Sequence, residues 1–310
     1  MYAQNSQKGK INGILVIFIF IYLHTWYMNL RKLKRIIFSS NPLNIRRNEI
    51  VLEIGSGQNP QSRSDILLDK YLFDNTERSF GQVIIIDRSF VVGDAMKLPF
   101  KDKSIDYTIC KHVLEHLETP KQFFEELMRV SKRGYIETPT ELAEKMFGWK
   151  FHKWYINKIR DKIVLTSKEK VLYSQLFYNI FHKKIREDKY LKKFYQKNPN
   201  LFIMSYEWNK RIKYEINGGD LQPIEFETAK LDYNYLEIIN RKIKISIKRR
   251  FYLEFKKIVK IILYGKRKLN LYSIIACPEC KQSLIKKMNI LVCIRCQKEY
   301  KIIQGIPILL

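Results

Sequence analysis

Two glycines one residue apart, Gly55 and Gly57, lie in the stretch "EIVLEIGSGQNP" at residues 49–60, directly after an apolar run. Because glycine has no Cβ, the backbone of such a turn can approach a ligand closely. A dinucleotide fingerprint, G-x-G-x-x-G, would need a third glycine where Pro60 stands, and the phosphate-loop pattern G-x-x-x-x-G-K-[ST] does not occur here. The acid that precedes the glycines, Glu53, suits a ligand that joins a nucleoside to a charged amino-acid end, with the acid near the ammonium group.

Acidic residues also follow the next two apolar runs. Asp69 closes the run in "DILLDKY", and Asp94 with Ala95 follows the run in "FVVGDAMKLPF". An acid at the tip of a second strand can accept hydrogen bonds from both hydroxyls of a ribose. The sequence therefore predicts a nucleoside site built from three successive strand ends.

Four of the five cysteines form a second chemical motif near the C-terminus. Cys277 and Cys280 make one C-x-x-C pair, and Cys293 and Cys296 make another about a dozen residues later. In a chain that is not secreted, this spacing predicts one structural zinc ion held by four thiolates rather than disulfides. Cys110 lies alone in an apolar run and is interpreted as a buried core residue.

These residues require a particular set of elements to position them. Short apolar runs without alternation, typical of strands buried on both faces, alternate with helical stretches such as "TPKQFFEELMRV". Such alternation predicts an α/β fold with a doubly wound parallel sheet, whose ligands bind at the carboxyl ends of the strands.

Four blocks in order, "VLEIGSG", "VVGDAMKLPF", "SIDYTICKHVLEHL" and "ELMRVSKRGYIETP", resemble the class I S-adenosylmethionine-dependent methyltransferases of the type 11 group. The resemblance covers roughly residues 40–155. It implies a Rossmann-like sheet, with Glu53, Gly55 and Gly57 around the methionine part of S-adenosylmethionine and Asp94 and Ala95 beside the adenine.

The resemblance leaves the ribose-binding acid open. Asp69 is preferred, and Asp87, at the end of "QVIIID", is the alternative, because the usual long helix after the glycine turn is shortened here. The family's frequent third glycine is replaced by Asn59. The cysteine block with its "GIPILL" ending resembles the Trm112-like zinc-binding domain, which implies a partner or stabiliser of the methyltransferase core.

With a methyl donor implied, three residues become candidates for work on the acceptor. His112 follows the fourth expected strand and is the first candidate for a general base. Glu137 follows the fifth strand, and His152, in "FGWKFHKW", could close over a substrate with Trp154. Each has a structural alternative. His112 would only contact cofactor or water, and His152 and Trp154 would only pack. Glu137 would cap the helix that starts within "TPTELAEKMF", where Thr138 and Pro139 fit the cap and first-turn positions.

The stretch "HVLEH", residues 112–116, also matches the H-x-x-E-H signature of a zinc peptidase. That chemistry needs both histidines on one continuous helix. His112 lies within three residues of an expected strand, so the methyltransferase interpretation is preferred.

The chain has a net charge of +26 at pH 7, and the excess positive charge lies outside residues 49–126. An apolar stretch at residues 11–30, followed by "RKLKR", predicts a membrane anchor or an interfacial helix, with a soluble helix as the alternative. Residues 241–268 are basic with interleaved apolar residues, which suits an anionic membrane surface or, less favoured, a nucleic acid. The alternative is the solvated face of an ordinary helix.

We therefore expect four parts: an apolar helix in 1–40, the cofactor-binding core in 41–155, a basic helix-rich region with a β-hairpin at "LFIMSYEWNKRIKYEI" in 156–270, and a zinc-binding domain in 271–310. The predicted function is methyl transfer to a small-molecule, glycan or lipid-linked acceptor by a cytoplasmic, membrane-associated enzyme. The alternatives are an RNA or protein methyltransferase and a non-catalytic adenosyl-binding scaffold.

Overall fold

The computed structural model describes residues 43–72, 84–149, 151–168, 187–218 and 269–310, together with 181, 183–185, 251–255, 258 and 261. The chain divides into two units. Residues 45–245 and 266–310 form one, and residues 1–44 with 246–265 form the other, in which residues 251–255 are helical.

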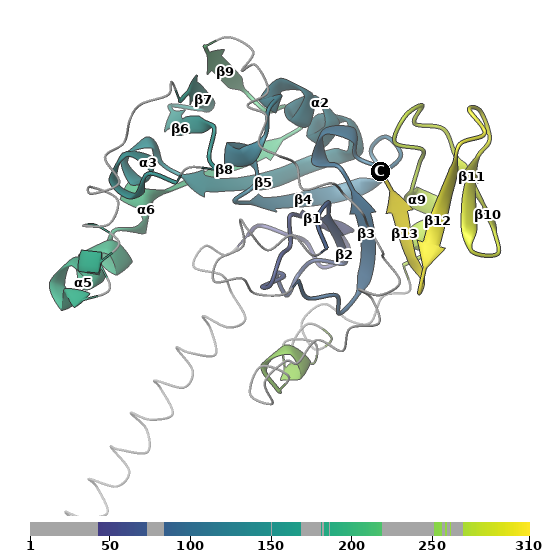
Figure 1. Cartoon of the computed structure of the whole chain (residues 1–310), viewed down its shortest axis with the longest axis horizontal. Coiled ribbons are helices and arrows are strands. Elements are labelled where there is room, and N and C mark those ends of the chain that lie inside the picture. Colours follow the sequence, from purple (N-terminus) through teal and green to yellow (C-terminus); the bar gives the residue numbers. More distant parts are fainter. Residues whose placement is uncertain are drawn as a thin grey trace, which may run out of the picture. The chain divides into compact units, whose positions relative to one another are not determined.

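A parallel sheet of five strands forms the centre of this unit (Figure 1). Its order is β3-β2-β1-β4-β5, and every neighbouring pair is parallel. The bounds are β1 Val51–Ile54, β2 Ile66–Asp69, β3 Ser89–Gly93, β4 Ile105–Lys111 and β5 Ser131–Pro139. The predicted Rossmann-like parallel sheet is confirmed. All five strands end at one edge, and the chain reverses its direction of progress across the sheet between β1 and β4.

The strands form where the sequence is apolar on both faces. All four residues of β1 and of β2 are buried, as in a parallel sheet covered on both sides. Helix α2, Pro120–Val130, connects β4 to β5 and buries Phe123, Phe124, Leu127 and Val130 on one face. The connection from β1 to β2, residues 55–65, contains turns and no helix.

Shorter helical turns follow the other strands. After β3 comes η2, Ala95–Lys97; after β4 comes η3, Leu114–His116; and after β5 comes α3, Glu141–Phe147. These turns hold the residues that directly follow the strand ends, where the candidate site residues lie.

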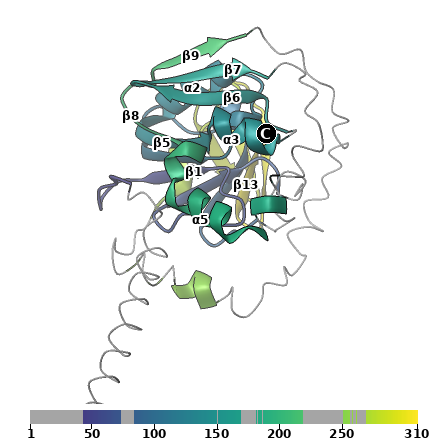
Figure 2. The ribbon, with the colours of Figure 1, turned by 90° about the vertical axis from the view of Figure 1, so that its left-hand side faces the viewer.

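The predicted hairpin at residues 201–216 is wrong. Its two strands, β8 (Ile203–Asn209) and β9 (Tyr214–Asn217), belong to different sheets. β8 pairs antiparallel with β5, whereas β9 pairs parallel with β7 (Lys162–Ser167), which itself pairs antiparallel with β6 (Trp154–Ile159). Figure 2 shows this three-stranded sheet beside α2. Helices α5 (Lys189–Lys197) and α6 (Pro199–Phe202) precede β8.

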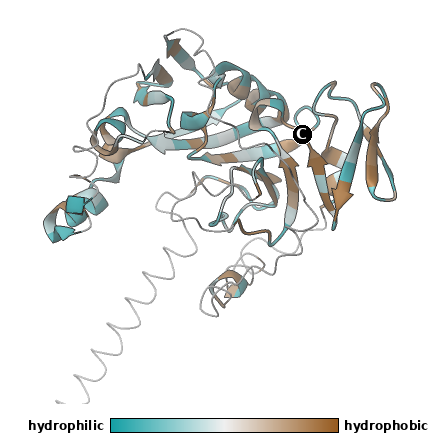
Figure 3. Cartoon of the chain, viewed as in Figure 1, coloured by the Kyte–Doolittle hydropathy of each residue, from teal (hydrophilic) through white to brown (hydrophobic). Residues whose placement is uncertain are grey.

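The cysteine-rich segment is continuous with the core sheet. It contains α9 Leu271–Ile274, β10 Leu284–Lys287, β11 Ile290–Cys293, β12 Glu299–Ile303 and β13 Ile306–Leu309. The first three of these strands and β13 form an antiparallel meander, and β13 then pairs parallel with β3, so that ten strands form one sheet. Strand β13 is strongly hydrophobic (Figure 3), in keeping with its sequence "IPIL". The expected small domain is therefore hydrogen-bonded to the edge of the cofactor-binding core.

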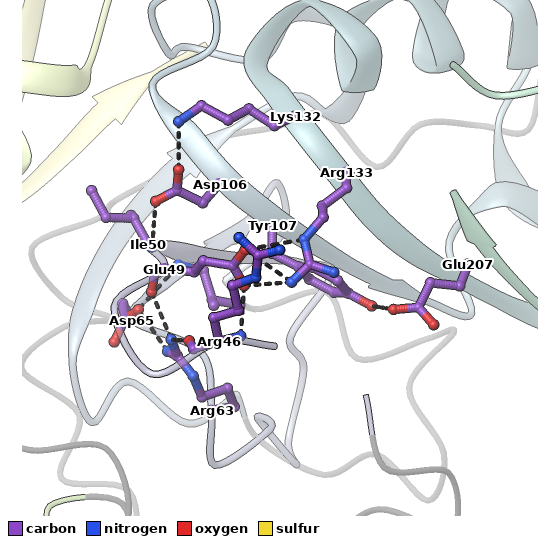
Figure 4. Close-up of polar contacts among 11 residues, drawn as sticks. Arg46, Glu49, Ile50, Arg63, Asp65, Asp106, Tyr107, Lys132, Arg133 and Glu207 are labelled. Carbon is purple, nitrogen blue, oxygen red and sulfur yellow. Dashed lines mark hydrogen bonds and ion pairs between the residues drawn. The ribbon is translucent and has the colours of Figure 1, made fainter. Parts of the chain in front are cut away.

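Polar side chains connect the amino ends of the strands, opposite the site edge (Figure 4). Arg133 of β5 binds Glu49, just before β1, at 2.6 Å, and Asp106 of β4 accepts a hydrogen bond from the backbone of Ile50 at 2.8 Å. Burial alone would raise the pKa of Glu49, but the hydrogen bonds from Arg133 and the Arg46 backbone lower it overall. This network fixes β1 against β4 and β5.

Two predictions concern residues that the structure does not describe. Residues 11–30 and most of residues 241–268 lie outside the described ranges. Among the described residues, no helix is both long and apolar enough to cross a membrane.

The attachment of β13 to the core can be tested by substitution. Leu309 is fully buried and pairs with Gly93 of β3. We expect Leu309→Ala to lower the free energy of unfolding by about 2–5 kcal/mol, because the change leaves a cavity between the two segments. Leu310→Ala, at a position that is 38% exposed, is the control and should cost less than about 0.5 kcal/mol. Urea unfolding monitors both, and equal small losses would contradict tight packing at this edge.

Candidate active site

The glycine turn after β1 leaves space for a ligand. Gly55 and Gly57 have φ angles of +67° and +49°, a region that residues with a side chain rarely adopt. A Cβ on Gly55 would lie 2.3 Å from Val113 Cγ2, whereas a Cβ on Gly57 would meet no atom within 4 Å. Gly55 is therefore required for packing, and Gly57 borders open space at the carboxyl edge of the sheet.

Glu53 holds the loop that follows this turn. Its side chain is buried, and its Oε2 accepts hydrogen bonds from the Gln61 backbone N–H, at 2.8 Å, and from the Ser64 hydroxyl. The buried carboxylate thus holds the loop at Gln61 and Ser64, which follows the glycine turn. The contact with a cofactor ammonium that the sequence suggests stays a prediction.

Asp69 lies at the tip of β2, next to the glycine turn. Its Oδ1 accepts a hydrogen bond from the Tyr71 N–H at 3.1 Å, and its Oδ2 lies 3.4 Å from the Gly57 nitrogen. The turn and the acid are thus joined directly, as a site that binds a ribose beside the turn requires.

Asp87, the alternative acid, lies elsewhere. Residues 84–87 form no strand, and Asp87 comes before β3 rather than at its carboxyl end. Both its oxygens bind the guanidinium of Arg88, at 2.7 and 2.9 Å, and Arg88 also donates to the carbonyls of Gln61 and Ser64. Asp87 is therefore a structural partner of Arg88, and this geometry favours Asp69.

Asp94 and Ala95 follow β3 at the same edge as the glycine turn. Asp94 caps η2 through a hydrogen bond from the Met96 N–H at 2.8 Å, and its other oxygen binds Lys70 Nζ at 2.8 Å. Burial would lower the pKa of Lys70, but the hydrogen bond and charge of Asp94 outweigh it and raise this pKa. Sequence reasoning missed Lys70; its position directly after Asp69 was the available signal.

His112 lies directly after β4 with a φ of +53° and a half-exposed side chain. Its Nδ1 is 3.2 Å from Glu115 Oε1, and its Nε2 is 3.8 Å from Glu137 Oε1. Burial would lower the pKa of His112, but the hydrogen bond and charge of Glu115, with the charge of Glu137, raise it overall. Conversely, burial would raise the pKa of Glu115, and His112 holds it below its usual value.

The peptidase interpretation of residues 112–116 is not met. Helix η3 contains only Leu114–His116, so His112 and His116 do not share a continuous helix. Sequence reasoning missed Glu115 as a site residue of a methyltransferase. The available signal was its position between His112 and His116; the structure adds that its side chain is 1% exposed.

Glu137 lies near the end of β5, opposite His112. Its Oε2 accepts a hydrogen bond from the Tyr135 hydroxyl at 2.5 Å and lies 3.2 Å from Lys111 Nζ. It has no role at the next helix: Thr140 caps α3 by accepting from the Ala143 N–H at 3.2 Å. The expectation that Thr138 and Pro139 form this cap is wrong, because both still belong to β5.

His152 is largely buried in a cluster of charged and aromatic side chains. Its Nδ1 contacts Glu144 Oε1, and its ring lies 5.2 Å from that of Trp149 at 30° and 4.6 Å from that of His116 at 80°. The second oxygen of Glu144 binds Lys168, whose pKa is lowered by burial. The structure thus brings His152 to the β4 end.

Trp154, the expected partner of His152, has a packing role. It is 2% exposed, and its indole N–H donates to the Leu117 carbonyl at 2.7 Å. Trp154 therefore packs inside the protein, which was the structural alternative for this residue.

The four cysteines converge as their spacing predicts. Sγ–Sγ distances are 3.7 Å for Cys277–Cys296, 3.3 Å for Cys280–Cys293 and 3.7 Å for Cys280–Cys296. A tetrahedral ion with bonds of about 2.3 Å would separate its sulfur ligands by about 3.8 Å. The cluster is therefore compatible with one metal ion.

Hydrogen bonds prepare two of these thiols for the thiolate form. Burial opposes ionisation of Cys293, but the backbone N–H groups of Cys296 and Arg295 lower its pKa to about 6. Burial likewise opposes a lowered pKa at Cys277, and here backbone N–H groups and the Tyr300 hydroxyl, 3.1 Å from the sulfur, outweigh it. Metal ligands of this kind must be deprotonated, so the donor set fits the group.

Comparison with known proteins agrees with this geometry. Residues 68–136 match the family model described as "Methyltransferase domain", from β2 into β5. The predicted resemblance to S-adenosylmethionine-dependent methyltransferases is confirmed for this segment.

Two curated relatives match parts of the chain. Demethylmenaquinone methyltransferase of Paenarthrobacter aurescens (strain TC1) is 28% identical over 109 residues, which is 34% of this chain and 42% of that protein. Ajmaline N-methyltransferase of Rauvolfia serpentina is 39% identical over 46 residues, 15% of this chain and 16% of that protein. The chain thus spans less than half the length of either relative.

Among solved structures, a complex of the Haloferax volcanii Trm112 methyltransferase activator aligns with 56% of this chain and 86% of that chain, at 12% identity and a TM-score of 0.34. An S-adenosylmethionine-dependent methyltransferase of Thermotoga maritima aligns with 41% of this chain and 60% of that chain, at 19% identity and a TM-score of 0.26.

The buried cluster around Glu144 yields a stability prediction. Its carboxylate is 1% exposed and binds both Lys168 and His152. We expect Glu144→Gln to cost about 3–5 kcal/mol of unfolding free energy, because it leaves the Lys168 ammonium buried without its partner. Glu215→Gln removes a half-exposed pair with Lys162 and should cost less than about 1 kcal/mol. Chemical denaturation of both variants compares them; similar losses would show that the buried pair has no special weight.

Proposed function

We propose that this protein is an S-adenosylmethionine-dependent methyltransferase. The observation that carries the proposal is the meeting of the Gly55–Gly57 turn, Asp69 and Asp94 at the carboxyl edge of a β3-β2-β1-β4-β5 sheet. Ligands of open α/β sheets bind at this edge, next to the point where the strand order reverses. The family match over residues 68–136 supports the same conclusion.

The residues around the turn receive distinct roles. The open space beside Gly57 would admit the methionine part, with Glu53 holding the loop beneath it. Asp69 would accept the ribose hydroxyls, and Asp94 with Ala95 would border the adenine. Lys70 keeps Asp94 in place through its 2.8 Å ion pair.

Once bound, the cofactor supplies a sulfonium that is already an activated methyl donor, so the protein mainly aligns the nucleophile with the methyl carbon. His112 is the proposed general base, because it stands at the rim of β4 and two carboxylates favour its holding a proton. Glu137 keeps His112 oriented from β5, and Lys111 and Tyr135 fix Glu137 in turn. His152 borders the same side of the site.

For the acceptor we favour a small molecule, glycan or lipid-linked precursor over RNA or protein. The two curated relatives are named for demethylmenaquinone and ajmaline, both small molecules. The excess of acidic over basic residues in 49–126 gives the cofactor region no charge complementarity to a nucleic acid.

We propose that the four-cysteine cluster binds zinc and stabilises the core through β13. Four thiolates favour zinc among the common divalent ions, and such closed sites are structural. The pairing of β13 with β3 supports this role, because β3 ends next to Asp94.

For location we keep the proposal of a cytoplasmic enzyme held at a membrane by residues 11–30. Its support is the apolar run followed by "RKLKR". Separation of cell lysate into membrane and soluble fractions, with and without residues 1–40, tests it; an unchanged soluble distribution of both forms would refute it.

Binding of S-adenosylhomocysteine to the full chain, measured by calorimetry, tests the cofactor. We expect Asp69→Asn to weaken binding by about 10- to 100-fold, because hydrogen bonds to a charged carboxylate contribute about 1.5–3 kcal/mol. Asp87→Asn is the matched control, and it should change the affinity less than about threefold because Asp87 is occupied by Arg88. Absence of binding to folded, zinc-loaded wild-type protein would contradict the methyltransferase and favour a scaffold that binds no adenosyl cofactor.

A further inference from the structure

Three side chains at the end of β4 form a cluster that cofactor binding does not require. One ligand atom each of Glu115, His116 and His152 lies within 4.8 Å of the others. Glu115 and His116 are neighbours in η3, whereas His152 comes from the segment between α3 and β6. The fold therefore joins one carboxylate and two imidazoles from two distant segments, with no cysteine among them.

One carboxylate oxygen of Glu115 is buried and accepts no hydrogen bond from the described residues. The side chain is 1% exposed, Oε1 contacts His112 Nδ1 at 3.2 Å, and Oε2 is buried without a hydrogen bond from any described residue. An unsatisfied buried polar atom costs about 1–3 kcal/mol, and more for a charged group. A cation between Glu115 and the two histidines would satisfy this oxygen.

His152 is oriented as a metal-binding histidine would be. Its Nδ1 contacts the carboxylate of Glu144, which leaves Nε2 for another ligand, and Trp149 stacks on the ring. Histidines that bind metals regularly use their other ring nitrogen in this way, because the carboxylate fixes the ring and strengthens the ligand. Glu144 is itself held by Lys168.

We propose that Glu115, His116 and His152 bind one first-row divalent cation such as Mn²⁺, Fe²⁺ or Zn²⁺, and that the ion keeps an open position for an oxygen ligand. Two imidazoles and a carboxylate suit these ions better than Mg²⁺ or Ca²⁺, which prefer oxygen ligands alone. Three protein ligands leave at least one position to water or substrate.

The open position gives the site a catalytic use, and this step rests on the proposed methyltransferase function. An acceptor hydroxyl bound to the cation would have a lowered pKa. Its proton would pass to His112, and the oxygen would attack the methyl carbon. The sulfonium sulfur would take the electron pair of the broken C–S bond and leave as the neutral thioether of S-adenosylhomocysteine. The acceptor class is therefore an alcohol or phenol, which makes this an O-methyltransferase.

The test titrates Mn²⁺ into the full chain with zinc already in the four-cysteine cluster, where thiolates keep zinc in preference to Mn²⁺. Electron paramagnetic resonance measures free Mn²⁺, and water-proton relaxation reports whether bound Mn²⁺ keeps exchangeable water. We expect about one Mn²⁺ per chain with enhanced relaxation, and at least a tenfold loss of affinity in both His116→Gln and His152→Gln. Glu118→Gln, an exposed acid that pairs with Lys153, is the matched control and should bind as the wild type does.

The outcomes separate the two proposals. Absence of Mn²⁺, Fe²⁺ and Zn²⁺ binding beyond the cysteine cluster in wild-type protein would overturn the site, whether or not the variants fold. Binding unaffected in both histidine variants would overturn it too, and bound Mn²⁺ without relaxation enhancement would overturn the open position. S-adenosylhomocysteine binding is measured in the same samples; its loss with an intact Mn²⁺ site refutes only the methyltransferase, and its presence without the site refutes only the cation.

Discussion

The parallel pairing of β1 with β4 is the contact on which the rest of this structure depends. It is the point where the strand order reverses, so the loops after β1 and after β4 leave the same edge of the sheet in opposite directions. The glycine turn after β1 and His112 after β4 therefore lie next to each other at this edge of the sheet, where Val113 packs against Gly55. At the opposite edge, Glu49 and Asp106 tie the amino ends of these strands to β5 and to each other (Figure 4). The polar network thus sets the register, and the register aligns the strand ends that carry the candidate chemistry.

Strand β3 would be an edge strand of the parallel sheet if no further strand paired with it. An unpaired strand exposes hydrogen-bonding groups that invite pairing with another chain. Here β13 occupies this edge, and the meander that carries it is held by the four-cysteine cluster. The proposed metal binding at the cysteines would therefore act on the core through one strand, whose neighbour β3 ends beside Asp94.

The five parallel strands could be predicted from the sequence because a strand buried on both faces has a local signal, an apolar run such as "ILLD" or "SFVVG". The same local reasoning failed for β8 and β9. An Asn-Lys turn between two apolar runs favours a hairpin, but β5 offers β8 a long partner with seven paired positions, and β7 takes β9. The ribose acid was also ambiguous in sequence, since Asp69 and Asp87 both follow apolar residues. The structure separates them by strand bounds and partners, because Asp69 ends β2 beside Gly57 whereas Asp87 precedes β3 and pairs with Arg88.

The group formed by Glu115, His116 and His152 was beyond sequence reasoning for a different reason. His112 and His152 were chosen one by one for their chemistry, and no spacing rule brings η3 next to the segment after α3. The cost of the arrangement is informative. Two carboxylates, Glu115 and Glu144, are each 1% exposed, and burying charge is unfavourable unless partners compensate for it. Glu144 has His152 and Lys168, but Glu115 has an oxygen that no described residue satisfies. A core built for stability alone would favour apolar residues here, so the retention of this charge beside the proposed general base is best explained by a ligand that completes it.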